Sequence, residues 1–292
     1  MSDSKSPKIL ITGATGTIGM ELVKYLSAKE IPFKAMVRSL EKASELTAIS
    51  GAEVVLGDFN DTNSLENALN GIERVFLLTN SSEQAEEQQL RFVDAALKSG
   101  VTHIVKLSQW ASEAHSPVRF LRYHAVVEQK IRESGMKFTF LRPNLFMQGL
   151  LGFKDLIKYQ GQFFGAIGDA KISLIDTRDI AAAAGESLID RKHENKTYNL
   201  TGPEALSHYE MADKLSLATG KNILFVDVPS DALRETLIHA GFPEWQADGL
   251  VEDYAHYKRG EAAEIAKGVF ESTGAEPRSF DAFATDYATL FR

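Results

Sequence analysis

A glycine-rich segment near the N-terminus, residues 8–20, constrains the fold more than any other part of the chain. It reads KILITGATGTIGM, so a short apolar run is followed by glycines at positions 13, 16 and 19 and then by apolar residues at helical spacing. Gly13 permits a sharp turn, Gly16 lets backbone approach a phosphate, and Gly19 lets the helix pack against its strand. A helix N-terminus also attracts anions. The segment therefore predicts a dinucleotide-binding strand–turn–helix unit; the alternative is a purely structural turn.

Apolar runs and amphipathic segments alternate through the next 130 or so residues. We expect strands at 33–38, 52–56, 74–79, 104–108 and 138–142. We expect helices at 40–49, 81–99 and 124–134, and one more after the third strand, capped by Asp61 or Thr62. Such alternation indicates βαβ units, and continuous apolar strands are typical of a parallel sheet that is covered on both faces. The predicted fold is α/β, a doubly wound parallel sheet of the Rossmann kind with a smaller, mostly helical C-terminal lobe.

The rhythm loosens after Pro143, which suggests a boundary near residue 150. We expect residues 1–150 to form an NAD(P)-binding Rossmann domain and residues 151–292 a smaller substrate-side lobe interwoven with it. Residues 172–201, a strand, an Ala-rich helix and a further strand, should pack back on the sheet. Amphipathic helices are expected at 207–219, 230–240, 251–258 and 279–291.

Composition limits the partners and the chemistry. The chain of 292 residues has no cysteine, which excludes disulfides, thiolate metal sites and a cysteine nucleophile. Its net charge of −8 argues against a general nucleic-acid binder. The first residues lack the apolar core of a signal peptide, and no apolar run has membrane-spanning length. The seven histidines show no close-spaced ligand pair, so no metal is expected. We expect a cytoplasmic protein without nucleic-acid or membrane partners; the sequence leaves open a monomer or a homodimer.

Several short motifs together resemble an established family. They are TGATGTIG at residues 12–19, MVRS at 36–39, GDF at 57–59, LRPN at 141–144, DTRDIA at 176–181 and YNLTGPE at 198–204. The chain is similar to atypical short-chain dehydrogenases/reductases of the NmrA-like family, and within it to the triphenylmethane reductase and NAD(P)H:quinone oxidoreductase type. The resemblance covers most of the chain. It implies a Rossmann fold and an NAD(P)H-dependent oxidoreductase.

The end of the second predicted strand bears on the choice of cofactor. A site that prefers NAD places an acidic residue there, whereas this chain carries Arg38 followed by Ser39. A guanidinium pairs with a 2′-phosphate and cannot accept from a ribose diol. We therefore expect NADP(H) in preference to NAD(H); the alternative is an ordinary exposed arginine. The cofactor-binding residues expected from the motif, the strand ends and the resemblance are Thr12, Gly13, Thr15, Gly16, Thr17, Ile18, Gly19, Arg38, Ser39, Asp58, Phe59, Thr79, Asn80, Leu107, Ser108, His124, Pro143 and Phe146.

The Tyr-x-x-x-Lys pair that serves most of this superfamily is missing. By the resemblance, Phe120 takes the place of the tyrosine and His124 that of the lysine. Neighbouring helical side chains diverge by about 100°, so Tyr123 is a poor substitute for the acid. We expect His124 to be the catalytic candidate, either as a hydrogen-bond partner of the cofactor ribose or as a proton shuttle; the alternative is a structural histidine.

Aromatic and amide residues beyond the fifth and sixth predicted strands suggest an apolar cleft for a flat conjugated ligand. The expected substrate residues are Gln109, Trp110, Asn144, Met147, Phe163 and Trp245. An electron-poor acceptor takes a hydride with little acid help, so the missing tyrosine favours a reductase of quinone-like, dye-like or other conjugated small molecules. Two alternatives stay open: an NADP(H)-binding redox sensor without catalysis, and a biosynthetic imine-type reductase or isomerase.

Overall fold

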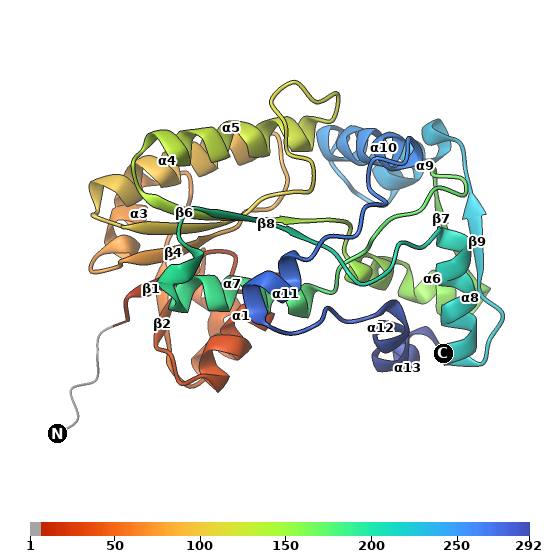
Figure 1. Ribbon diagram of the computed structural model, residues 1–292, viewed down its shortest axis with the longest axis horizontal. Helices are drawn as coiled ribbons and strands as arrows, with labels where there is room; N and C mark the ends of the chain where they lie inside the picture. The colour runs from red at the N-terminus through yellow and green to blue at the C-terminus, as the bar shows by residue number, and fades with distance from the viewer. Residues whose placement is uncertain (1–6) are drawn as a thin grey trace.

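The computed structural model describes residues 7–292, except the side chain of residue 42, and is built on a seven-stranded parallel sheet (Figure 1). The strand order is β3-β2-β1-β4-β5-β6-β8, and every neighbouring pair is parallel. The strands are β1 (Ile9–Ile11), β2 (Phe33–Val37), β3 (Ala52–Leu56), β4 (Arg74–Leu77), β5 (His103–Leu107), β6 (Lys137–Pro143) and β8 (Lys196–Leu200). The order reverses between β1 and β4, and ligands of such sheets bind at the carboxyl ends of the strands near that point.

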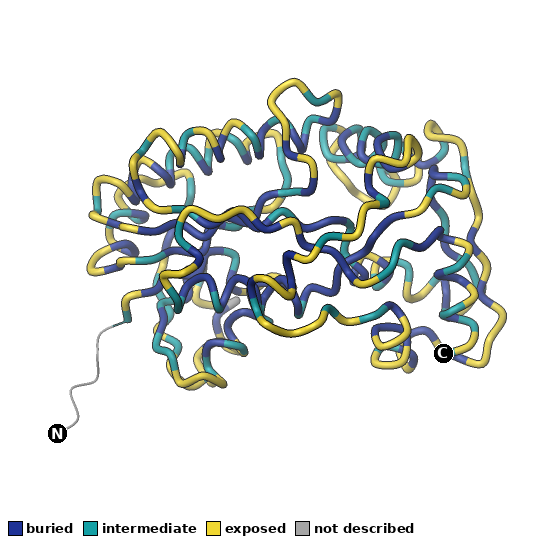
Figure 2. Tube along the Cα trace, in the orientation of Figure 1, coloured by how far each residue is buried: buried dark blue, intermediate teal, exposed yellow. Residues whose placement is uncertain are grey.

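Helices cover both faces of the sheet. One layer contains α3 (Thr62–Leu69), α4 (Ala85–Lys98) and α5 (Arg119–Glu133). The opposite layer contains α1 (Thr17–Ala28), α7 (Thr177–Ile189) and α11 (Gly268–Thr273). All five residues of β5 are buried, as expected for a strand covered on both sides. Figure 2 shows the middle of the large sheet mostly in the colour of buried residues. The predicted doubly wound α/β fold is confirmed.

A smaller lobe lies beyond the carboxyl ends of the strands. It holds a two-stranded parallel sheet of β7 (Gln162–Gly165) and β9 (Leu224–Asp227). Its helices are α6 (Lys154–Gln160), α8 (His208–Thr219), α9 (Ser230–His239), α10 (Glu244–Lys258), α12 (Phe280–Asp286) and α13 (Ala288–Phe291). Between these elements the chain returns to the large sheet, where α7 packs against α1 and β8 pairs with β6.

Some predicted element boundaries were wrong. Helix α5 begins at Arg119 instead of residue 124, and α10 begins at Glu244 instead of residue 251. The two helix starts contact each other, since the Arg119 guanidinium donates to the Trp245 carbonyl at 3.0 Å. The first turns of both helices are stabilised by a contact between distant parts of the sequence, so the local pattern of apolar residues does not indicate where the helices begin.

Other corrections concern shorter elements. The helix expected at 81–99 begins only at Ala85, and the one expected at 40–49 is a 3₁₀ turn, Leu40–Ala43, followed by the single turn α2 (Ser44–Thr47). The strand expected from residue 172 consists of two isolated bridges, Phe146 to Ile175 and Ile172 to Leu206. The last expected helix is interrupted between α12 and α13, and β7, β9, α6 and α11 were not expected.

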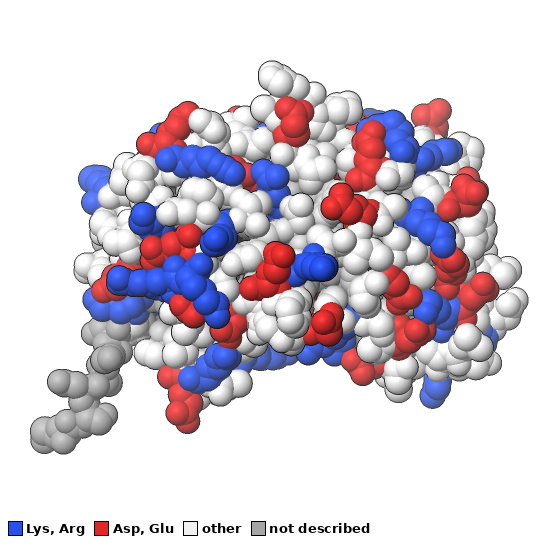
Figure 3. Space-filling view, in the orientation of Figure 1, with Lys and Arg blue, Asp and Glu red and all other residues white. Residues whose placement is uncertain are grey.

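The surface mixes charges of both signs. On the face shown in Figure 3, lysine and arginine side chains alternate with aspartate and glutamate, with no continuous basic stripe. No helix within residues 7–292 is long and apolar enough to cross a membrane.

Candidate functional site

A groove of about 790 Å³ lies over the glycine-rich turn, at the carboxyl ends of the central strands. Its walls come from the turn and α1, the ends of β2, β3 and β4, and the segment after β6. The lining residues are Gly13, Thr15, Gly16, Thr17, Ile18, Met36, Val37, Arg38, Gly57, Asp58, Phe59, Asn60, Leu78, Thr79, Asn80, Ser82, Gln84, Gln88, Phe146, Gln148, Gly149 and Thr177.

The glycines of the turn have distinct structural roles. Gly13 has a φ of +64°, a conformation that strains other residues. A Cβ on Gly19 would lie 2.0 Å from the Gly13 carbonyl oxygen, so only glycine lets α1 pack this close. A Cβ on Gly16 would meet only that same oxygen, at 3.3 Å, and would otherwise face the groove. Gly16 thus leaves the space in front of the helix open for a ligand.

The groove suits the phosphates of a dinucleotide. Gly16 caps α1 without a side-chain hydrogen bond, so the first N–H groups of this 12-residue helix are available to an anion. At the end of β2 the exposed Arg38 side chain lines the groove and forms no ion pair within residues 7–292. A free guanidinium beside a helix N-terminus matches a ligand with more than one phosphate.

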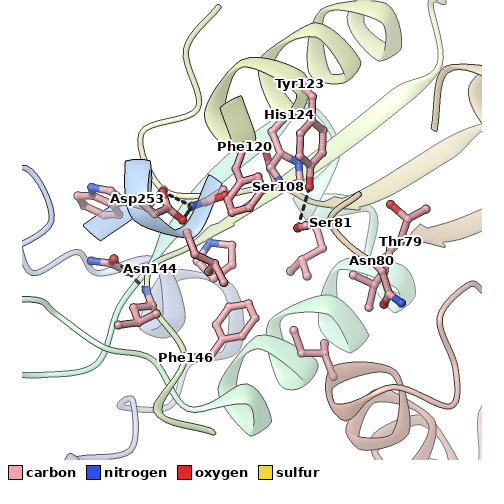
Figure 4. A pocket seen from close by; sticks show the side chains of 18 of the residues that line it. Thr79, Asn80, Ser81, Ser108, Phe120, Tyr123, His124, Asn144, Phe146 and Asp253 are labelled. Carbon is pink, nitrogen blue, oxygen red and sulfur yellow. Dashed lines mark hydrogen bonds between the residues drawn. The ribbon is translucent and has the colours of Figure 1, made fainter. Parts of the chain in front are cut away.

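A second cavity of about 350 Å³ continues from the groove into the space between sheet and lobe. The two share Ile18, Leu78, Thr79, Asn80 and Phe146. Figure 4 shows Thr79 and Asn80 on one side of it, Asp253 on the other and Phe146 between them. The further lining residues are Ser81, Leu107, Ser108, Gln109, Trp110, Phe120, Tyr123, His124, Pro143, Asn144, Leu145, Leu250, His256 and Tyr257. A ligand in this cavity would therefore lie beside one in the groove.

His124 is held from behind by a buried lysine of β5. The Lys106 Nζ lies 2.8 Å from His124 Nδ1 and donates to the Leu107 carbonyl at 2.9 Å. Burial, together with the charges of Lys106 and Arg142, holds the pKa of His124 well below its usual range. When Lys106 carries its proton it can only donate, so Nδ1 accepts from it and the proton of the neutral imidazole is on Nε2. Helix α5 lacks the lysine of the usual pair, but strand β5 supplies an amine directly behind His124.

A buried carboxylate joins three elements behind the cavity. Glu128 of α5 accepts from Ser108 Oγ at 2.6 Å and from the Arg142 guanidinium at 2.9 and 2.6 Å. Its side chain is only 3% exposed, whereas that of Arg142 is 23% exposed. These bonds tie α5 to the ends of β5 and β6, and they fix the hydroxyl of Ser108 at the cavity wall.

The position of Phe120 explains why a tyrosine is absent there. A Cβ on Gly249 of α10 would lie 2.3 Å from the ring atom Cζ of Phe120, the atom that carries the hydroxyl in tyrosine. A hydroxyl at this place would meet the backbone of α10 and would not project into the cavity. Tyr123, three residues along, binds Ser81 Oγ at 3.2 Å, and burial raises its pKa, which makes it a weak acid.

Asp253 brings a carboxyl group into the cavity from α10. It is 6% exposed and accepts from Gln109 Nε2, at 3.1 Å to Oδ1 and 2.9 Å to Oδ2. Burial raises the pKa of Asp253 to about 7. Within the described residues it forms no ion pair, so nothing neutralises its charged form.

The residues expected at the cofactor divide between the two spaces. In the groove lie Gly13, Thr15, Gly16, Thr17, Ile18, Arg38, Asp58, Phe59, Thr79, Asn80 and Phe146. In the inner cavity lie Leu107, Ser108, His124 and Pro143. Three line neither space: Thr12 Oγ1 donates to carbonyls of β4 and its extension, Gly19 packs under the turn, and Ser39 caps a 3₁₀ turn.

The residues expected at the substrate divide similarly. Gln109, Trp110 and Asn144 line the cavity. Met147 and Phe163 lie in the apolar core of the lobe, and Trp245 packs against Phe120 outside the lining.

Sequence reasoning missed Lys106, Asp253, His256 and Tyr257. Spacing could have grouped the last three, since positions 253, 256 and 257 share one face of a helix. Nothing local marks that face as a cavity wall. Lys106 interrupts the apolar run of β5, which was a signal that a buried partner should be sought.

Burial of Lys106 makes stability depend on pH. Desolvation lowers its pKa from 10.5 to about 7. Between these values the unfolded chain holds a proton that the folded chain has released, so the free energy of unfolding should rise with pH. Lys106→Met lacks this contribution. We expect the stability of the unmodified protein relative to Lys106→Met to increase from about pH 7 to about pH 9, by at most about 1.4 kcal/mol per pH unit. Urea unfolding at both pH values measures it; a constant difference would show that Lys106 stays charged.

The fold and the groove define a Rossmann-type protein with a glycine-rich dinucleotide turn and an added lobe. The model of the NmrA-like family matches residues 5–283, and the chain belongs to this family. It is 37% identical over 283 residues to the NAD(P)H azoreductase of Xenophilus azovorans, covering 97% of this chain and 99% of that protein. The predicted family is thereby confirmed.

Two solved structures have a similar fold. One is the NADPH-dependent quinone oxidoreductase QOR2 of Escherichia coli complexed with NADPH, with a TM-score of 0.86, 28% identity, and 95% of this chain and 99% of that chain covered. The other is the Citrobacter sp. triphenylmethane reductase complexed with NADP(H), with a TM-score of 0.84, 27% identity, and 96% and 99% covered.

Proposed function

We propose that the protein is an NADPH-dependent reductase of quinone-like, azo or other dye-like conjugated molecules that works without the Tyr-x-x-x-Lys pair. The observation that carries this proposal is the continuity of the phosphate-binding groove with an aromatic cavity. Relatives named as an azoreductase, a quinone oxidoreductase and a triphenylmethane reductase support the reaction class. The last two were solved with NADPH or NADP(H), which supports the cofactor.

The residues of the groove fit NADP(H). The open face of Gly16 and the N-terminus of α1 would hold the pyrophosphate, and Arg38 the 2′-phosphate. When bound, the cofactor supplies a hydride from its nicotinamide. Phe146, Thr79 and Asn80 border both spaces, so the nicotinamide end belongs at this junction.

His124 serves as a fixed donor at the wall of the inner cavity. Because Lys106 occupies Nδ1, its Nε2–H is the group left to donate to a ribose hydroxyl or to the substrate. A neutral imidazole N–H holds its proton tightly. The ring therefore orients the ligand by a hydrogen bond and does not transfer its proton to it. Lys106 is then a positioning residue, since it acts through His124.

Turnover of conjugated acceptors tests the proposal. NADPH oxidation, followed by the loss of its absorbance, should be measurable with a benzoquinone or naphthoquinone and with a simple azobenzene. Tight NADPH binding without reduction of any acceptor in such a panel would contradict the reductase and favour the redox sensor.

The preference for NADPH is a separate prediction. Arg38→Ala should weaken NADPH binding by roughly 1.5–3 kcal/mol, about 10- to 150-fold, because a charge-assisted hydrogen bond to the 2′-phosphate is lost. NADH lacks that phosphate, so its affinity should hardly change. Calorimetric titration of both cofactors measures this, with Lys24→Ala on the exposed side of α1 as the control. Equal losses for the two cofactors would place Arg38 elsewhere on the ligand.

A further inference from the structure

We infer that Asp253 is the proton donor of this reductase: it delivers a proton to the substrate atom that the hydride does not reach. This inference rests on the proposed function. It identifies the acid that would take the role of the missing tyrosine. Four observations carry it: the place of the carboxyl group in the cavity, its two hydrogen bonds from Gln109, the lack of any other acidic proton there, and its charge surroundings.

Asp253 lies on the wall opposite the groove. Figure 4 shows it across the cavity from Thr79 and Asn80, which border the groove. A flat substrate that enters between Phe146 and α10 would therefore have the nicotinamide side at one end and Asp253 toward the other. Reduction of a conjugated double bond needs this arrangement, because hydride and proton add to different atoms.

Two hydrogen bonds from one amide hold the carboxyl group in place. Gln109 Nε2 donates to both of its oxygens, and Gln109 itself follows shortly after the end of β5. The Tyr257 side chain, one turn along α10, lines the same cavity. An acid on a helix, fixed by a side chain from the central sheet, is well suited to repeated proton delivery.

The other titratable groups of the cavity are unsuitable as acids. Burial raises the pKa of Tyr123 and that of Tyr257 well beyond their usual range. Burial lowers the pKa of His124 and of His256, so both rings are neutral near pH 7. Asp253 is left as the cavity group whose proton is both present and transferable near neutrality, since its pKa is about 7.

The charged group that faces Asp253 favours its protonated form. It is Glu252 of α10, whose negative charge raises the pKa of Asp253. The hydroxyls of Tyr123 on α5 and Tyr254 on α10 face it as neutral groups. The neutral Gln109, from the loop after β5, and the Tyr257 hydroxyl favour the charged form, but burial outweighs them. No cation pairs with Asp253 in the part of the chain that the structure describes.

The step balances for an azo substrate. Hydride from NADPH forms an N–H bond at one nitrogen, the π bond of N=N breaks, and its electron pair takes the proton of Asp253 at the other nitrogen. The azo compound is reduced to a hydrazo compound, NADPH is oxidised to NADP⁺, and Asp253 becomes a carboxylate that regains its proton from solvent.

Asp253→Asn tests the inference with little change of shape. With azobenzene and NADPH, kcat/KM should fall by about 10²-fold through kcat, whereas KM and the NADPH affinity should hardly change. Glu244→Gln, at the exposed start of the same helix, is the matched control and should keep full activity. The melting temperature of each variant shows that it is folded, and titration with NADPH shows that it binds the cofactor.

The pH profile of the unmodified protein gives a second readout that needs no variant. The acid must be protonated to act, so kcat/KM should decline as pH rises above about 7, and Asp253→Asn should lose this decline. A flat profile, or an unchanged kcat in Asp253→Asn, would overturn the inference while leaving the reductase intact. A rise confined to KM for cationic dyes would overturn it too, by making Asp253 a binder of positive charge. No oxidation of NADPH by the unmodified protein would overturn both proposals.

Discussion

Replacing Gly16 with valine is expected to weaken NADPH binding by about 10²–10⁴-fold while the protein stays folded. The fold should survive, because a Cβ at this position meets only one backbone oxygen, at 3.3 Å, and a shift of a few tenths of an ångström relieves this tight contact. It would fill the space where the pyrophosphate approaches the first N–H groups of α1. Losing two hydrogen bonds to a charged group costs about 3–6 kcal/mol, which gives the expected range.

The control for this variant is a glycine outside the groove. Gly152 is exposed and lines neither space, and a Cβ on it would have no heavy atom within 4 Å, so Gly152→Val should bind NADPH normally. Calorimetry measures the affinity, and the melting temperature shows whether each variant is folded. Unchanged NADPH affinity in a folded Gly16→Val would mean that the pyrophosphate lies elsewhere.

The features that sequence predicted well are those encoded within one short segment. The strand–turn–helix of residues 8–20 is such a case, because its apolar run, its glycines and its helical spacing are adjacent. The parallel sheet followed from the same kind of evidence, since each buried strand is its own apolar run. Arg38 could be assigned to the groove because a strand end is a defined place in this fold.

The inner cavity could not be predicted in this way. Gln109 and Asp253 meet across 144 positions of sequence, and the wall they form depends on how α10 packs against α5. The periodicity of α10 is weak, so its early turns were missed altogether. Lys106 was hidden for a different reason: a lysine within an apolar run signals a buried partner but does not identify it, and here the partner, His124, comes from a helix 18 positions later.

Aromatic residues show a further limit of prediction from sequence. Trp110 and Phe163 looked alike as candidates for a substrate pocket, but Trp110 lines the cavity and Phe163 packs in the core of the lobe. Composition identifies residues that avoid water, and tertiary packing decides whether their neighbour is a ligand or another side chain.

Replacing Glu128 with leucine is expected to lower the free energy of unfolding by about 3 kcal/mol. The change removes a carboxylate that is almost fully buried, leaves the Arg142 guanidinium without its partner, and takes the acceptor from Ser108 Oγ. Breaking a buried pair by removing one partner costs about 3–5 kcal/mol, and we take the lower value because Arg142 is partly exposed. The melting temperature should fall by roughly 6–12 °C.

A double variant separates the lost ion pair from lost packing. If the cost of Glu128→Leu comes mainly from the unpaired guanidinium, then adding Arg142→Leu should recover at least half of it, because two apolar side chains replace the pair. Glu133→Gln, exposed near the end of the same helix, should change stability by less than about 0.5 kcal/mol. Urea unfolding of the three variants gives the values. Without recovery in the double variant, the role of Glu128 would lie in the bond to Ser108 at the cavity wall, and turnover of quinones should then fall in both variants alike.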